Sequence, residues 1–162
     1  MRWLVLLAVL FQLYQVTRIP QGRGMEPILV GQAMDRGVVP YSQFKFHDGP
    51  VMPLFFAGLF AVPSLIWIAL VYCLFNLLTT RAIYLLSRLH GCSVECACAA
   101  AILFLLLLPW WEANGSIETA MTTFGLWAFY FAGTDRKELA AVLVVLAALT
   151  KQTGLIFGLC LL

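Results

Sequence analysis

The chain consists of long apolar runs separated by short polar turns, with one long polar segment after the first run. A transmembrane helix needs about 20 consecutive apolar residues to cross roughly 30 Å of hydrocarbon. Runs that approach this length predict an all-α protein, a polytopic transmembrane bundle of about five spans with interfacial helices in the polar segment. The predicted spans are residues 3–17, 64–86, 93–108, 117–132 and 139–162.

Residues 51–89 form an apolar stretch that is too long for one span, and Pro53 and Pro63 interrupt it. We expect residues 51–62 to form an interfacial or part-spanning helix ahead of the span at 64–86. The opposite order, with the span first and an amphipathic piece after it, gives the same topology. A tight turn at Pro63 that creates two spans also stays open.

The overall composition agrees with this pattern. The chain is 62% hydrophobic and 11% charged, whereas an ordinary soluble domain is about 45–50% apolar and about 25% charged. A soluble fold of this length cannot bury so much apolar surface, so we expect an integral membrane protein in contact with lipid. The net charge of +2 and the scattered basic residues indicate no nucleic-acid partner.

The N-terminus resembles a secretory signal peptide, because Arg2 precedes an apolar run from Trp3 to Phe11. No small-residue cleavage site follows this run, so we expect an uncleaved first span. The five cysteines lie in or beside apolar runs, and we interpret them as packing residues. Cys92, Cys96 and Cys98 lack the second pair of ligands that structural zinc sites use.

Basic residues near the span ends set the expected orientation, because cytoplasmic loops are enriched in Lys and Arg. A cytoplasmic N-terminus places most of them inside and the polar loop at residues 18–50 outside. The residues on the cytoplasmic side are then Arg2, Arg81, Arg88, His90, Arg136 and Lys137. We expect a multi-pass protein of the plasma or inner membrane. The apolar run reaches Leu162 without a polar tail, so we also expect the N-terminal part of a larger protein.

The outer loop at residues 18–50 concentrates the charge of the chain. It holds seven of the eighteen charged residues, and His47 as well. Long loops on a compact scaffold are disproportionately functional. The charged residues are Arg18, Arg23, Glu26, Asp35, Arg36, Lys45 and Asp48.

Three short motifs resemble those of a known family, and they occur in the family's order. They are Ala33 to Tyr41 (AMDRGVVPY), Phe46 to Pro50 (FHDGP) ahead of an apolar run, and Ala148 to Gly154 (ALTKQTG) in a later span. Together they resemble the C superfamily (GT-C) of membrane glycosyltransferases. This family includes the protein O-mannosyltransferases and the lipid A aminoarabinose transferase.

The resemblance implies a transferase whose donor is a sugar on polyprenyl phosphate. Such enzymes bind the lipid tail between helices and carry out the chemistry at the outer surface. Their key acid lies in the first outer loop soon after the first span, a position that Glu26 fits best here. The resemblance leaves a divalent metal open as a cofactor, and it leaves open whether the acceptor is a glycan, a lipid or a protein.

Sugar transfer from such a donor has chemical requirements that this sequence can meet. A carboxylate takes the acceptor proton, typically worth about 10²–10⁴-fold in rate. Cations stabilise the leaving phosphate, and exclusion of water prevents hydrolysis. We expect Glu26 and Asp48 to be the catalytic carboxylates, with Asp35 and Glu118 as a wall of the acceptor or metal site. The expected phosphate-binding residues are Arg23, Lys45, His47 and Lys151, the last lying deep in an apolar segment.

Each of these residues also has an ordinary structural interpretation. Asp35 and Asp48 suit solvated turns, Glu118 suits a helix N-terminus, and Lys45 and Lys151 can snorkel to the interface. Two other functions stay open. A transporter or channel subunit would carry charges in several spans and internal repeats. A non-catalytic membrane scaffold would not need a charged outer loop.

Overall fold

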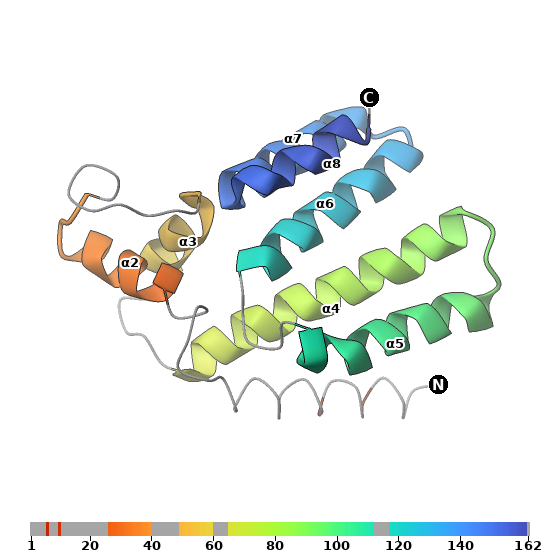
Figure 1. Ribbon diagram of the computed structural model, residues 1–162, viewed down its shortest axis with the longest axis horizontal. Helices are drawn as coiled ribbons and strands as arrows, with labels where there is room; N and C mark the ends of the chain where they lie inside the picture. The colour runs from red at the N-terminus through yellow and green to blue at the C-terminus, as the bar shows by residue number, and fades with distance from the viewer. Residues whose placement is uncertain are drawn as a thin grey trace.

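The computed structural model describes residues 26–39, 49–59, 65–111 and 117–161, together with Leu6 and Leu10. Within these ranges the chain is helical and contains no strand, which confirms the all-α prediction (Figure 1). The elements are α2 (Glu26–Asp35), α3 (Val51–Leu59), α4 (Leu65–Leu89), α5 (Val94–Trp111), α6 (Ile117–Gly133), α7 (Lys137–Thr150), the 3-10 turn η2 (Gln152–Gly154) and α8 (Leu155–Leu159).

Helices α4 and α6 run side by side in the same direction at the centre of the bundle (Figure 1). Close to their middles the rings of Phe75 and Phe124 meet edge to face, with centroids 5.9 Å apart. Near their ends the Leu89 side chain lies against Gly133. Helix α5 packs on α4 and α7 packs on α6, and each runs back antiparallel.

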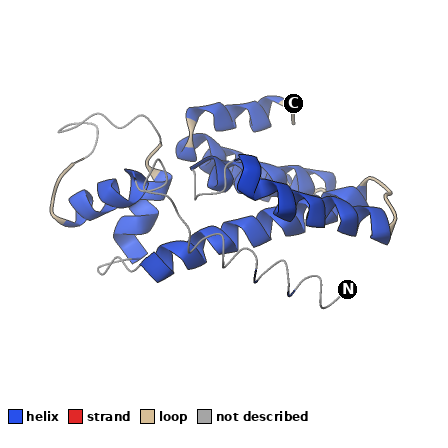
Figure 2. Cartoon of the chain, turned by 60° about the horizontal axis from the view of Figure 1, so that its bottom comes forward, coloured by secondary structure: helices blue, strands red, loops and turns tan. Residues whose placement is uncertain are grey.

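This arrangement gives the bundle two distinct ends. Helices α4 and α6 begin, and α5 and α7 finish, at the end where α2 and α3 also lie, which we call the loop end (Figure 1). The short connections after α4 and after α6 lie at the opposite end, which we call the turn end. Figure 2 shows the same helical layers from another side.

Buried polar side chains join α4 to α6. The hydroxyl groups of Thr79 and Thr123 lie 2.6 Å apart, and both side chains are buried. The Thr123 hydroxyl donates to the Thr119 carbonyl oxygen at 2.7 Å, so it accepts the hydroxyl proton of Thr79. Trp127 Nε1 donates to the Leu78 carbonyl oxygen at 3.1 Å. Hydrogen bonds of this kind hold helices together where the surroundings are apolar.

The connections at the turn end are short because both helices stop with a left-handed residue. Gly91 has φ 83° after α4, and the Cys92 N–H donates to the Ser87 carbonyl oxygen at 3.0 Å. Asp135 takes the same place after α6 with φ 62°. This is the Schellman arrangement, which satisfies the last carbonyl groups of a helix. The next helix therefore starts within a few residues and runs antiparallel.

Helices α2 and α3 pack on the loop end through one apolar cluster. Part of the polar segment at residues 18–50 is thus helical, as predicted, and it is anchored on the bundle by its apolar side chains. The buried residues of this cluster are Ile28, Val30, Met52, Val71, Tyr72, Phe75 and Ala120, with Met34 and Phe124 packed against them.

The predicted span at residues 139–162 is not one continuous helix. Helix α7 ends at Thr150, and Lys151 adopts an extended backbone with φ −151° and ψ 137°. The chain then passes through η2 into α8. The apolar pattern continues across this point, so it does not reveal the break.

Helix α8 turns back along α7. Gly154 lies against the backbone of Ala147, and Gly158 lies against Val144. The later residue on α8 meets the earlier residue on α7, so the two helices are antiparallel. A Cβ atom at position 154 would overlap the Ala147 backbone, and the reversal therefore depends on glycine at that position.

Among the described residues, the stretch Leu70–Leu89 in α4 is long and apolar enough to cross a membrane, and Val94–Leu107 in α5 is a shorter apolar helix. Helices α3, α5 and α6 occupy the segments where an interfacial helix and the third and fourth spans were predicted. The predicted first span lies outside the described residues apart from Leu6 and Leu10, which are helical and exposed. The number of crossings stays a prediction.

Thr123→Val tests the link between α4 and α6, because it removes the hydroxyl and keeps the side-chain shape. We expect the free energy of unfolding to fall by roughly 0.5–1.5 kcal/mol, since the buried Thr79 hydroxyl loses its partner. Thermal unfolding of the purified protein in detergent measures this. Thr122→Val, at the half-buried neighbouring position, is the control and should change stability by less than about 0.5 kcal/mol. Equal losses in both variants would contradict the role of Thr123.

Candidate functional site

The end of the polar segment is attached to the end of α7 at the loop end. The Gly49 N–H donates to the Thr150 carbonyl oxygen at 3.0 Å. Gly49 lies so close that a Cβ atom there would overlap the Leu149 carbonyl group. Because α7 stops at Thr150, its last carbonyl groups need partners from outside the helix. The polar segment supplies one of them.

The helix break directs Lys151 out of the hairpin formed by α7 and α8. Its own N–H still donates to the Ala147 carbonyl oxygen at 3.0 Å, and the Gly154 N–H donates to the Lys151 carbonyl oxygen at 2.8 Å. The Thr150 hydroxyl donates to the Leu146 carbonyl oxygen at 2.7 Å. The backbone on both sides of Lys151 is therefore fixed, and the long side chain leaves from a defined point.

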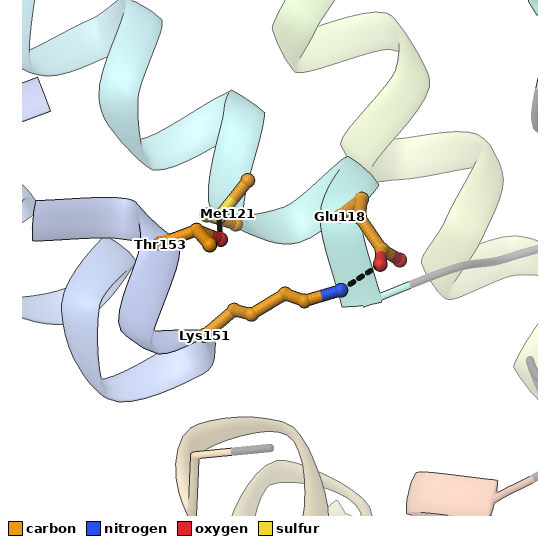
Figure 3. A network of polar contacts seen from close by, with 4 residues as sticks. All are labelled: Glu118, Met121, Lys151 and Thr153. Atoms are coloured by element: carbon orange, nitrogen blue, oxygen red, sulfur yellow. Dashed lines mark hydrogen bonds and ion pairs between the residues drawn. The ribbon is translucent and has the colours of Figure 1, made fainter. Parts of the chain in front are cut away.

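Lys151 Nζ forms an ion pair with the Glu118 carboxylate, as Figure 3 shows. Glu118 lies in the first turn of α6, where the N-terminal end of the helix favours a negative charge. The two side chains are 30% and 32% exposed, so the pair is partly accessible to solvent. Thr153 donates to Met121 Sδ at 3.3 Å and forms a second contact between the same two elements.

Tyr72 in α4 completes the surroundings of this pair. The residue is 2% exposed and belongs to the same buried cluster as Ala120, which lies in the first turn of α6 with Glu118. Sequence reasoning missed Tyr72, because an aromatic residue inside an apolar run gives no polar signal. Its place at the loop end could be found only from the packing of α4 on α6.

Of the predicted site residues, the structure brings Glu118 and Lys151 together. Asp35 is exposed at the end of α2, and Glu26 is the first residue of α2, with its side chain outside what the structure describes. The remaining predicted site residues lie outside the described ranges: Arg23, Lys45, His47 and Asp48. In the described ranges, no three His, Cys, Asp or Glu side chains form a metal-ligand group.

No protein-family model, curated protein or solved structure matches this chain. The fold and the site together define a helical protein with a polar site at one end of its bundle. In the described ranges it has one helix long and apolar enough to cross a membrane.

Gly49→Ala tests the attachment of the polar segment. The new methyl group would collide with the backbone of Leu149, so we expect the segment to leave the end of α7. Hydrogen–deuterium exchange should become at least about tenfold faster in the peptide that contains residue 49, because its amide loses the Thr150 carbonyl as partner. The turn around Gly91, at the opposite end, serves as an internal control. Unchanged protection at residue 49 would refute this attachment.

Proposed function

We propose that this chain is a membrane glycosyltransferase that transfers a hexose or pentose from a polyprenyl-phosphate donor to an acceptor at the non-cytoplasmic face. The supporting observation is that the end of the polar segment meets the helix break beside the Glu118–Lys151 pair. Two of the three motifs that resemble the GT-C family, FHDGP and ALTKQTG, are joined here by the hydrogen bond from Gly49 to Thr150.

The proposed topology has a cytoplasmic N-terminus and about five crossings, with the loop end outside. The distribution of charge supports it. At the turn end, a group of exposed basic residues suits the cytoplasmic side. These residues are Arg88, His90, Arg136 and Lys137.

In the proposed reaction, the Glu26 carboxylate takes the proton of an acceptor hydroxyl, and Asp48 assists it. The acceptor oxygen forms a bond to the anomeric carbon of the sugar, and the bond from that carbon to the phosphate oxygen breaks. The phosphate stays on the polyprenyl lipid with its additional negative charge. Stabilising this charge with fixed cations contributes strongly to such a reaction.

The cations for this step come from two places in the proposal. Lys151 approaches from the helix break, and Arg23, Lys45 and His47 belong to the polar segment. A charge on Lys151 that is only partly exposed acts more strongly on a phosphate than one in bulk water. A divalent metal remains compatible with the proposal as a further source of positive charge.

The orientation can be tested with thiol labelling in intact cells. We expect an impermeant maleimide to label a cysteine introduced by Arg36→Cys, at the exposed end of α2. Native Cys96, exposed at the turn end, should react only after the membrane is permeabilised. Mass spectrometry of the labelled peptides separates the two sites. Labelling of Cys96 in intact cells would reverse the proposed orientation.

The catalytic assignment predicts the loss of sugar transfer in three variants. In membranes supplied with polyprenyl-phosphate hexose or pentose labelled in the sugar, Glu26→Ala, Asp48→Ala and Lys151→Gln should each slow release of label from the lipid fraction by about 100-fold or more. Lys137→Gln, which removes an exposed lysine at the turn end, is the control and should retain full activity. If Glu26→Ala and Asp48→Ala both transfer normally, the site assignment is wrong.

A further inference from the structure

Each partner of the Glu118–Lys151 pair stands at a helix end that can support its charge. Glu118 lies at the start of α6, where the partial positive charge of the helix favours a carboxylate. Lys151 directly follows the last residue of α7, where the partial negative charge favours a cation. Separating the two side chains therefore leaves both charges in favourable places.

The pair is also accessible. The side chains are 30% and 32% exposed, and pairs that water can reach contribute little to stability. Lysine is a compact charge on a flexible stem, so its ammonium group can move while the backbone at the helix break stays fixed. Figure 3 shows the Lys151 side chain extended from the hairpin toward α6.

A phosphate anion is a strong competitor for this lysine. It offers several acceptor oxygens and a charge at least as negative as that of one carboxylate, and charge-assisted hydrogen bonds to it are strong. Lys151 directly follows Thr150, whose carbonyl oxygen accepts the Gly49 N–H, so a phosphate bound to Lys151 would lie beside the end of the polar segment. The same ammonium group can then form an ion pair either with Glu118 or with the phosphate.

We propose that Glu118 is an intramolecular competitor that holds Lys151 until a phosphate monoester or diester displaces it. The inference rests on the proposed function for the source of that phosphate. Binding transfers the Lys151 ammonium group from the carboxylate to the phosphate, and no covalent bond changes. Glu118 is thereby a positioning residue for Lys151. This differs from a role in the wall of the acceptor or metal site. Removing a competitor strengthens phosphate binding, whereas removing a residue that contributes to the site weakens it.

The test measures phosphate binding to the full chain in nanodiscs. Polyprenyl monophosphate is titrated into wild-type protein, Glu118→Gln, Lys151→Gln and the double variant, and the dissociation constants are obtained by native mass spectrometry. We expect Glu118→Gln to bind about threefold to tenfold more tightly than wild type, because the competitor is gone. Lys151→Gln and the double variant should both bind more weakly than wild type.

Matched variants separate a local effect from a change of total charge. Glu138→Gln removes an exposed carboxylate at the turn end and should leave binding unchanged. Glu118→Asp keeps the charge but shortens the reach, so it should give a smaller gain than Glu118→Gln. If Glu118→Gln fails to fold, as judged by gel filtration, Glu118→Asp alone decides the sign.

Titrations with inorganic phosphate and with polyprenol distinguish a free phosphate from a lipid-borne phosphate as the ligand. A gain with both inorganic phosphate and polyprenyl phosphate supports a site for the shared phosphate group. A gain with inorganic phosphate alone supports the competition and contradicts the lipid donor of the proposed function. A gain with polyprenol, weaker or unchanged phosphate binding in Glu118→Gln, or a gain that survives in the double variant would overturn the inference. Phosphate competition without any sugar transfer would refute the proposed function alone.

Discussion

The end of α7 at Thr150 is the constraint on which the loop end depends. Because the helix stops there, the Thr150 carbonyl oxygen accepts the Gly49 N–H, and the next residue, Lys151, reaches sideways to Glu118. Two consecutive residues thus attach the polar segment and α6 to the same point. A helix that continued through Lys151 would satisfy its own carbonyl groups. The lysine side chain would then point in the direction set by the helical repeat of about 100° per residue.

The rest of the bundle supplies a firm base for this point. Thr79 and Thr123 hold α4 and α6 together, so the first turn of α6 stays beside Tyr72 of α4. The apolar cluster of α2 and α3 covers the same end. The Glu118–Lys151 pair at this end is only partly exposed, so its charges interact more strongly than they would in bulk water.

The helices could be predicted from the sequence, because apolar runs of the right length have few alternatives to helix. The break at Lys151 could not, because the run on each side of Lys151 to Gly154 is equally apolar. Glu118 and Lys151 were each recognised by their charge in or beside an apolar segment. Their pairing depends on how α8 folds back on α7 and how α7 packs on α6, and residue spacing carries no record of that. Tyr72 was missed because its position beside the first turn of α6 follows only from the packing of α4 on α6.

Three glycines limit which substitutions the C-terminal part of this chain can accept in related sequences. The ring of Phe157 occupies the space where Gly125 lacks a side chain, and Gly154 and Gly158 let α8 approach α7. Related chains that retain the hairpin should therefore keep glycine at these positions. Exposed apolar residues nearby, such as Leu155 and Leu159, can be replaced by other large aliphatic residues. An invariant set of small residues among variable large ones would be the evolutionary signature of this fold.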